Sequence, residues 1–397
     1  MRRGFLSSRP VRPAVVSALI ATLFLLFLGT PPASAADPVS SCKLSGTTGW
    51  TDEGQNTDYN VFQRPTGTKR VIMLFVDFPD AAATETTSSD AAQLTPAADW
   101  LWKASYGKTW LSITQHNAWL RMPKNSTDYG FERGVSHETH EAYIKDAVNK
   151  ADPQVDFSQY DMVYVVATRN APAISFTPTY IYDPGTAGIT ADNVTVKWAV
   201  TFGQDMWDWG YKIVAHETAH SFGLPDLYAF DTGADMHRYV GGWDVMGKVG
   251  GKGPQYFAWQ SWKLGWTPDT QVVCRATAGS DTVYLSAVEY GSYNKMAVIK
   301  TSPTTAYVVE SRRGVYADSD VCSTGALVYK VDTSVTTGNG PIRVMDANPD
   351  ATPKSGCHAL DDAPYWVGQS FTDSAAGVKI EVTAADGYGE TVRITKS

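Results

Sequence analysis

Positive charge is scarce in this sequence. Its 397 residues include 33 Lys and Arg against 41 Asp and Glu, which gives a formal net charge of −8. Proteins that hold nucleic acid do so largely through Lys and Arg contacts to phosphate groups. The charge balance therefore argues against a nucleic-acid partner.

Long apolar runs are also missing, except near the N-terminus. Four arginines (Arg2, Arg3, Arg9 and Arg12) precede an apolar run over 14–28, and Ala-Ser-Ala follows at 33–35. This order is typical of a secretory signal peptide, and the run is shorter than the roughly 20 residues of a membrane-spanning helix. We expect residues 1–35 to be removed and the protein to be secreted, extracellular and without stable membrane association. Without the four arginines, 29 basic residues face 41 acidic ones, and the net charge becomes −12. The export route, general secretory or twin-arginine, stays open.

Cysteine is rare, with only four residues: Cys42, Cys274, Cys322 and Cys357. An even number in an exported chain predicts two disulfide bonds. We expect Cys322 to pair with Cys357, because both belong to the C-terminal region, and Cys42 to pair with Cys274. The alternative for Cys42 is a thiolate that caps a metal ion in a latent precursor.

Repeats of fixed period and low-complexity tracts are absent too, and the length suits one large domain with a smaller one. Residues 36–68 are rich in Ser, Thr, Gly and Asp and predict an irregular arm. Over 69–270, apolar strands alternate with helical segments, which predicts an α+β domain with a mixed, twisted sheet. The clearest elements are strands at 71–76 and 160–168, helices at 97–105 and 138–151, and a strand at 194–200 that we expect at a sheet edge bordering a cleft.

The pattern changes after Trp266. Short β-type runs separated by Gly, Asn, Pro and Ser predict an all-β, sandwich-like module over 271–397. The runs lie at 281–288, 295–301, 306–312, 326–332 and 378–386. Its acidic residues are open to two interpretations, as calcium ligands or as solvated charges: Asp332, Asp346, Asp361 and Asp362.

The stretch "VAHETAHSFGLPDLY", residues 214–228, concentrates chemically active side chains. Residues four apart share one face of a helix, so His216 and His220 can direct two imidazole nitrogens at one ion. Glu217 lies one step round the helix, where it can reach a water beside that ion without being a ligand. Catalytic zinc takes three protein ligands, so a third must be found.

Glutamate is absent from Thr218 to Gln260, which excludes a third ligand from a Glu on a following helix. Gly223 and Pro225 predict a sharp end to the helix instead. Asp226 then falls where the metzincin pattern His-Glu-x-x-His-x-x-Gly-x-x-His has its third ligand, and zinc accepts a carboxylate oxygen there. The alternatives to Asp226 are Asp231, Asp235 and Asp244.

Two neighbouring features complete the predicted site. Met246, in "GGWDVMG", suits the Met-turn beneath the metal of metzincins, although a lone methionine is usually a core residue. An oxyanion partner is also needed, and Tyr228, Tyr239 and Tyr256 are the candidates, each of which could equally be a core aromatic.

A second pair of histidines resembles the first but lacks the spacing and the following residues of a metal site. His137 and His140, in "SHETHEAY", are three residues apart, and neither a Gly turn nor a Met-turn follows them. We expect a solvated first helical turn capped by Ser136.

Together, "HETAHSFGLPDLY", "GGWDVMG" and "FAWQSWKLGW" resemble the immune inhibitor A family of secreted bacterial metallopeptidases, and the likeness covers most of the chain from about Arg70. The resemblance implies a metzincin-like catalytic domain, a β-rich C-terminal module and zinc as the cofactor. It implies His216, His220 and Asp226 as zinc ligands and Glu217 as general base. Many relatives have Gly where this chain has Ala219, and some carry a long propeptide for which the arm leaves little room.

We therefore expect a secreted zinc endopeptidase that acts, as a monomer, on protein or peptide substrates. One alternative is a protein that keeps the metalloprotease fold for binding or adhesion without turnover. The intact His216, Glu217 and His220 count against it. A zinc hydrolase for a non-peptide bond is the third hypothesis.

Overall fold

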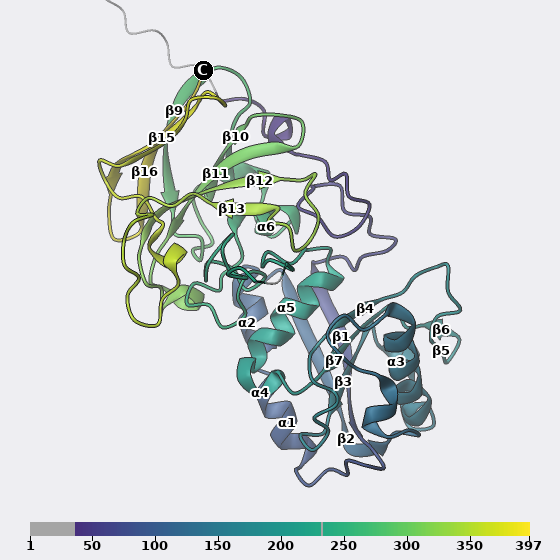
Figure 1. The fold of residues 1–397 in the computed structure, drawn as a ribbon. Coiled ribbons are helices and arrows are strands. Elements are labelled where there is room, and N and C mark those ends of the chain that lie inside the picture. The colour runs from purple at the N-terminus through teal and green to yellow at the C-terminus, as the bar shows by residue number, and fades with distance from the viewer. Residues whose placement is uncertain (1–35, 232) are drawn as a thin grey trace, which may run out of the picture. The chain divides into compact units, whose positions relative to one another are not determined.

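The computed structural model describes residues 36–397 except residue 232 (Figure 1). The expected signal peptide, residues 1–35, lies outside the described residues. No helix among those described is long and apolar enough to cross a membrane. Residues 36–397 fall within one compact unit, so the domain boundaries expected after residues 68 and 270 stay predictions.

A mixed five-stranded sheet carries the first part of the chain, as predicted. Its order is β2-β1-β3-β7-β4, with the first four strands parallel and β4 antiparallel to β7. The strands are β1 (Gly67–Asp77), β2 (Thr109–Arg121), β3 (Met162–Ala167), β4 (Thr179–Ile181) and β7 (Trp198–Phe202). A two-stranded hairpin, β5 (Thr190–Ala191) and β6 (Val194–Thr195), lies apart from this sheet.

The prediction that the strand near 194–200 forms the sheet edge is wrong. The structure divides that run between β6, in the separate hairpin, and β7, which pairs with β3 on one side and with β4 on the other. The edge is β4, only three residues long, in a Thr- and Pro-rich segment whose composition gave no strand signal. The antiparallel strand β4, which lies outside β7, therefore forms the sheet edge that borders the site described below.

Helices cover both faces of the sheet (Figure 1). Strand β1 shows why, because its alternate side chains enter different cores: Met73 packs beneath one set of helices and Leu74 beneath α3. The first set is α1 (Thr87–Leu94), α2 (Ala97–Ala104), α4 (Met206–Trp209) and α5 (Tyr211–Ser221), and the other face carries α3 (His137–Ala151). Short 3-10 helices η2 (Ser126–Tyr129) and η3 (Phe157–Gln159) precede and follow α3.

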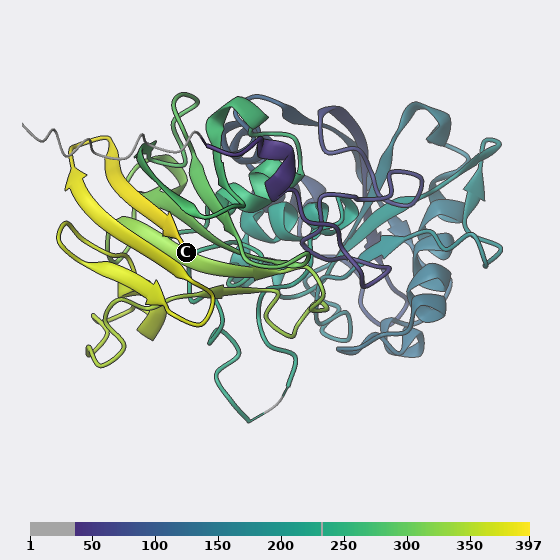
Figure 2. The ribbon, with the colours of Figure 1, turned by 90° about the horizontal axis from the view of Figure 1, so that it is seen from above.

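Two further sheets form a β-rich part, ordered β13-β12-β11-β10-β8 and β14-β15-β16-β9. Figure 2 shows them as layers, with yellow β15 and β16 beside the green strands. The five predicted runs are strands here. Three short strands (β8, β13 and β14) and the eight-residue strand β16 were not predicted. The strands are β8 (Val272–Arg275), β9 (Gly279–Ser286), β10 (Met296–Lys300), β11 (Thr305–Arg312), β12 (Gly325–Asp332), β13 (Ile342–Val344), β14 (Ser370–Asp373), β15 (Val378–Ala385) and β16 (Gly389–Lys396). Helix α6 (Ala258–Lys263) and 3-10 helices η4 (Asp269–Gln271), η5 (Tyr316–Asp318) and η6 (Ala359–Asp362) connect them.

The five-stranded sheet of the β-rich part is buried on both faces. Ile299 of β10 packs against the four-stranded sheet, whereas its neighbour Val298 joins the same core as Trp259 of α6 and Val214 of α5. That arrangement explains the continuous burial along β10 and β11, in contrast to the alternation along β15. The β-rich part and the helix of the predicted site thus share one apolar core.

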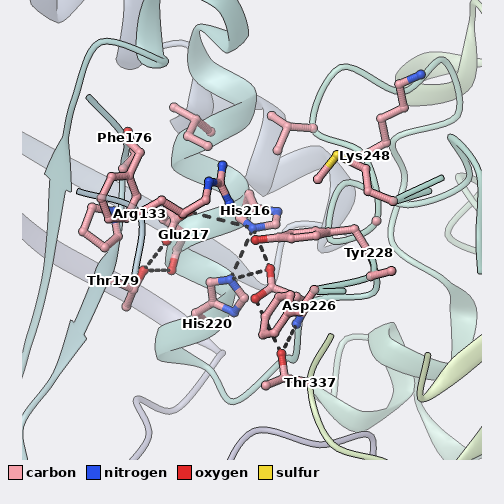
Figure 3. Close-up of a pocket in the computed structure, with 18 of the residues that line it drawn as sticks. Arg133, Phe176, Thr179, His216, Glu217, His220, Asp226, Tyr228, Lys248 and Thr337 are labelled. Carbon is pink, nitrogen blue, oxygen red and sulfur yellow. Dashed lines mark hydrogen bonds and ion pairs between the residues drawn. The ribbon is translucent and has the colours of Figure 1, made fainter. Parts of the chain in front are cut away.

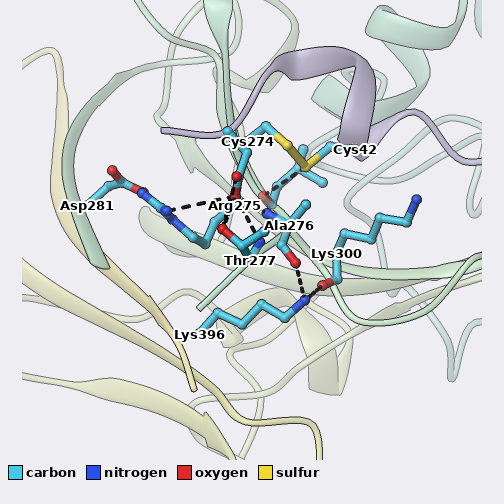
Figure 4. Close-up of a disulfide and its surroundings, with 10 residues drawn as sticks. Cys42, Cys274, Arg275, Ala276, Thr277, Asp281, Lys300 and Lys396 are labelled. Carbon is cyan, nitrogen blue, oxygen red and sulfur yellow. Dashed lines mark hydrogen bonds and ion pairs between the residues drawn. A yellow bond between two sulfur atoms is a disulfide. The ribbon is translucent and has the colours of Figure 1, made fainter. Parts of the chain in front are cut away.

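The N-terminal arm is irregular, with one 3-10 helix, η1 (Val39–Cys42), and it is built into the fold. The disulfides Cys42–Cys274 and Cys322–Cys357 are both present, as predicted. Figure 4 shows the first one joining the arm to β8, where Arg275 pairs with Asp281. No cysteine of the described residues is free, so Cys42 is not a thiolate that caps a metal.

Buried contacts fix the rest of the arm. Glu53 is fully buried, and its carboxylate accepts a hydrogen bond from Gln260 Nε2 at 2.8 Å. Further along the arm, Gln63 donates its backbone N–H to Ser221 O, at the end of α5, at 2.7 Å. The arm therefore belongs to the same core as the helix of the predicted site.

Candidate metal centre

Helix α5 ends in the turn that the sequence predicted. Gly223 takes a left-handed φ of +92°, and its N–H donates to His220 O at 2.9 Å. A Cβ at Gly223 would lie 3.0 Å from the Thr57 methyl of the arm, so both the backbone and the neighbouring chain favour glycine there. Pro225 follows, and the chain returns to bring Asp226 beside the last turn of the helix.

Three side-chain atoms converge at this point (Figure 3). His216 Nε2 and His220 Nε2 lie 3.2 Å apart, and Asp226 Oδ1 lies 3.1 and 3.2 Å from them. Three ligands of a tetrahedral zinc ion, each about 2.0–2.1 Å from the metal, stand roughly 3.3 Å from one another. The triangle therefore has the dimensions of a zinc site with a fourth position left for another ligand.

The Nδ1 atom of each histidine lies beside a backbone carbonyl, which determines where one hydrogen of the ring is. His216 Nδ1 lies 2.9 Å from Val245 O, and His220 Nδ1 lies 2.8 Å from Leu224 O. A carbonyl only accepts, so each Nδ1 carries a hydrogen, and each imidazole in its neutral form presents a lone pair on Nε2. Asp226 Oδ1 is buried, and it faces the two Nε2 atoms. Three lone pairs directed at one point fit a cation, and this donor set fits zinc.

Asp226 and the two imidazoles also change one another's pKa values. Burial opposes a charged imidazole, yet the Asp226 carboxylate raises the pKa of His220 to about 9. Burial also works to raise the pKa of Asp226, but the two imidazoles hold it well below its usual range. Positive charge, carried by a proton or by a metal ion, is therefore stabilised among these three groups.

Glu217 lies beside the triangle and outside it. Its Oε1 is 3.8 Å from His216 Nε2, and its Oε2 accepts a hydrogen bond from Thr179 Oγ1 of β4 at 2.8 Å. Burial raises the pKa of Glu217, and the two imidazoles lower it. One oxygen is thus held by the edge strand, and the other is available to exchange a proton with a group near the three converging atoms.

Met246 is fully buried, in a turn that contacts both the segment after Asp226 and His216. Its carbonyl accepts from Leu227 N at 3.0 Å, and its N–H donates to Asp244 Oδ1 at 2.7 Å. Because the preceding residue, Val245, accepts from His216, this turn also orients the first imidazole.

The alternative third ligands have other partners. Asp244 is buried, and its second oxygen accepts from Phe257 N at 2.6 Å. Asp231 pairs with Arg238, and Asp235 pairs with His358. Of the four candidate aspartates, the structure brings Asp226 to the two histidines.

The triangle opens into a cleft of about 970 Å³. Of the three predicted tyrosines, Tyr228 lines this cleft, and its ring stacks on His216 with centroids 6.3 Å apart. Tyr256 is fully buried and donates to Ala215 O at 2.9 Å, whereas Tyr239 lies between Arg238 and Arg343. The oxyanion candidates thus reduce to Tyr228.

The cleft also holds a cation that the sequence analysis missed. Arg133 lines the cleft in the loop before α3, and Figure 3 places it on the Glu217 side of the metal site. Burial raises the pKa of the Tyr228 phenol, and the Arg133 guanidinium acts against that rise. An isolated Arg in a loop gives no pattern by which the sequence could have singled it out.

Helix α3, which carries His137 and His140, confirms one prediction and contradicts another. Ser136 caps α3, since its hydroxyl accepts from Thr139 N at 3.2 Å. However, His140 is buried, so the prediction of a solvated first turn is wrong for that residue. The face of α3 that carries His140 packs on the sheet, where His140 Nε2 meets Thr201 Oγ1 at 2.9 Å. Burial lowers the pKa of His140 to about 3, and His137 adds to this effect.

The acidic residues of the β-rich part mostly serve local turns. Asp332 accepts from Ser334 N, Asp346 accepts from Asn348 N and Asp361 accepts from Gly242 N and His358 N. Asp362 Oδ1 is buried without a partner. Asp361 lies near Cys322 and Cys357, but those sulfurs are bonded to each other and cannot act as thiolate ligands. Calcium binding in this part stays a prediction.

Several residues of the site come from segments far from the histidines in sequence. Thr179, Val245 and Arg133 gave no sequence signal, because a carbonyl, a hydroxyl or a single Arg has no diagnostic spacing. We compared the chain with known proteins, and no protein-family model and no curated protein sequence matches it.

Proposed function

We propose that this protein is a secreted zinc endopeptidase that hydrolyses peptide bonds of extracellular proteins. The observation that carries the proposal is the convergence of His216 Nε2, His220 Nε2 and Asp226 Oδ1 within 3.2 Å, with Glu217 beside them. The resemblance of the same residues to the immune inhibitor A family supports the same activity and a metzincin-like catalytic domain.

The three converging atoms would hold the ion, and Glu217 would act as the general base. When bound in a site of this kind, zinc polarises the scissile carbonyl and lowers the pKa of water to about 7. Glu217 accepts the proton of the attacking water on Oε1 and passes it to the leaving amine. Thr179 keeps Oε2 engaged, so the carboxylate presents Oε1 to the cleft.

Two donors are available for the carbonyl oxygen as it gains negative charge. The Tyr228 phenol and the Arg133 guanidinium both line the cleft. Donors aimed at a developing oxyanion commonly contribute a factor of about 10²–10³ in turnover. Tyr228 stacks on the His216 imidazole, which holds the tyrosine ring beside the three converging atoms.

The cleft walls suit a polypeptide with large apolar side chains. Four aromatic or apolar groups from separate segments line it, and three of them are substantially exposed: Trp50, Phe176, Trp209 and Phe230. Aromatic walls around a few polar groups are the usual composition of a binding site. The arm contributes Trp50, so it forms part of the substrate-binding surface.

Casein digestion by the purified chain tests the proposal, with Glu217→Gln as the decisive variant. Glu217→Gln keeps the shape of the side chain and removes the base. We expect it to retain one zinc per chain and to lose about 10²–10⁴-fold in rate, the usual contribution of a general base. Glu138→Gln is the matched control, since Glu138 holds the equivalent position after His137 and is exposed. It should digest casein like the wild type.

The outcomes separate the three hypotheses for the site. Loss of digestion with a chelator, and its return with added zinc, would support a metallopeptidase. Bound zinc without casein cleavage, together with release from small ester or amide substrates, would favour a hydrolase for another bond. Bound zinc without any turnover would favour a binding protein, and full activity of Glu217→Gln would contradict the assignment of the base.

A further inference from the structure

We infer that Thr337, in a turn of the β-rich part, is a positioning residue for the third metal ligand, Asp226. The inference rests on the proposed function, because it concerns how the same site holds its ion. Thr337 follows Asp226 by 111 residues, and its hydroxyl accepts the backbone N–H of Asp226 at 2.9 Å. The same hydroxyl lies 3.5 Å from Asp226 Oδ2, to which it can donate.

The two oxygens of the Asp226 carboxylate have different partners. Oδ1 faces the two imidazole Nε2 atoms, and Oδ2 faces the Thr337 hydroxyl (Figure 3). A carboxylate that is held on one oxygen cannot rotate freely about its side-chain bonds. Thr337 therefore selects the rotamer in which Oδ1 points at the two histidines, and it does so from the side away from the ion.

The turn that carries Thr337 is itself fixed against the segment after Asp226. Gly338 N donates to Asp226 O at 3.1 Å, and Phe230 N donates to Gly338 O at 3.1 Å. Gly338 has a φ of +73°, and a Cβ there would lie 2.2 Å from Phe230 Cγ. Glycine thus lets the turn lie directly on the Phe230 ring, and two backbone hydrogen bonds, together with the bond from Asp226 N to the Thr337 hydroxyl, hold the two segments in register.

Each metal ligand consequently has an outer partner, but from different places. The two histidines are held by the carbonyls of Leu224, directly after α5, and of Val245, in the turn that contains Met246. Asp226 is held by the β12–β13 connection of the β-rich part. The β-rich part therefore completes the metal centre, and it is more than an attached binding module.

The same turn supplies a matched control. Thr336 is exposed, and its hydroxyl accepts from Asn339 Nδ2 at 2.8 Å within the turn. Replacing either threonine with valine removes one hydroxyl and keeps the branched shape. Only the change at residue 337 alters a contact to Asp226.

The experiment measures zinc affinity in the full chain by competition with a chromophoric chelator. We expect Thr337→Val to bind zinc about 10–100-fold more weakly than the wild type, the usual effect of removing an outer partner of a ligand. Thr337→Ser, which keeps the hydroxyl, and Thr336→Val should both bind like the wild type. The melting temperature of each metal-free variant is measured alongside. A positioning role predicts that zinc raises the melting temperature of Thr337→Val by less than that of the wild type at the same zinc concentration, whatever the metal-free melting temperatures are.

Either of two results would overturn the inference: wild-type zinc affinity in Thr337→Val, or equal weakening in Thr336→Val. If Thr337→Val does not fold, Thr337→Ala gives the same comparison, because it only deletes atoms from the wall of the cleft. Failure of the proposed function looks different, since the wild-type chain would then bind no zinc or cut no casein. A wild type that binds zinc beside an unchanged Thr337→Val would overturn the role of Thr337 alone.

Discussion

Two helices of this protein carry nearly the same letters and differ in what their histidines meet. In α3, His137 and His140 stand three apart, and in α5, His216 and His220 stand four apart. Each first histidine is followed by a glutamate. On α3, each Nε2 has its own partner, Ile181 O for His137 at 3.0 Å and Thr201 Oγ1 for His140. On α5, each Nδ1 has a carbonyl partner, and the two Nε2 atoms face each other.

The difference teaches how to distinguish a structural histidine from one that is a candidate metal ligand. An imidazole whose nitrogen meets an individual partner is satisfied, and burial then keeps it neutral. Imidazoles whose lone pairs converge on a carboxylate attract a cation. The pKa values follow this division: His140 falls to about 3, because burial penalises its charge, whereas Asp226 overcomes burial and raises His220 to about 9.

Removing one histidine from each helix should give the largest difference, which we expect in zinc content. We expect His220→Ala to retain no zinc after dialysis and to lose casein digestion, because two ligands remain of the three that a catalytic zinc requires. His140→Ala should keep one zinc per chain. Metal analysis of both dialysed proteins checks this, and equal zinc content in the two variants would erase the distinction between the helices.

The cost of losing His140 should appear in stability instead. Its ring packs against Phe131 at 5.8 Å and Tyr180 at 6.1 Å, and its loss leaves the Thr201 hydroxyl buried without that partner. We expect His140→Ala to lower the free energy of unfolding by about 3 kcal/mol at pH 7. Urea denaturation measures this value.

The same variant should show a defined pH dependence. The pKa of His140 lies near its usual 6.5 in the unfolded chain and at about 3 in the folded one, so the unfolded chain binds the proton first as the pH falls. Stability that depends on the neutral ring is therefore complete above pH 6.5 and is lost toward pH 3. The gap between wild type and His140→Ala should narrow by roughly 2 kcal/mol between pH 6.5 and 5. A gap that stays constant would contradict the buried, neutral ring.

The smallest effect should come from the start of α3. Ser136 caps that helix, whereas the N-cap residue of α5 is Gly210, which has no side chain to cap with. Ser136→Ala should cost about 1 kcal/mol in thermal or urea unfolding and leave zinc content and digestion unchanged. A change in zinc content would show that α3 and the metal site are coupled more closely than this account allows.

The sequence predicted most of the arrangement around α5, because its signals are local. The spacing of His216 and His220 and the turn at Gly223 and Pro225 bring Asp226 back to the helix by backbone geometry alone. The disulfide pairing and the mixed sheet followed from composition and pattern. Periodic signals of this kind depend on neighbours within a few turns of the chain.

What the sequence could not predict depends on contacts between distant segments. Thr179 reaches Glu217 from an edge strand of three residues, and Thr337 reaches Asp226 across 111 residues. The burial of His140 was missed for the same reason, since only packing of α3 on the sheet creates it. The position of a hydroxyl or a buried imidazole in the sequence follows no repeating pattern that would identify its partner in the folded chain.

The most direct test of the central claim is anomalous diffraction at the zinc absorption edge from crystals of the full chain. We predict one strong peak within bonding distance of His216 Nε2, His220 Nε2 and Asp226 Oδ1. We expect no peak beside His137 and His140. A zinc-soaked crystal without a peak at these three atoms, or with a peak on α3 instead, would contradict it.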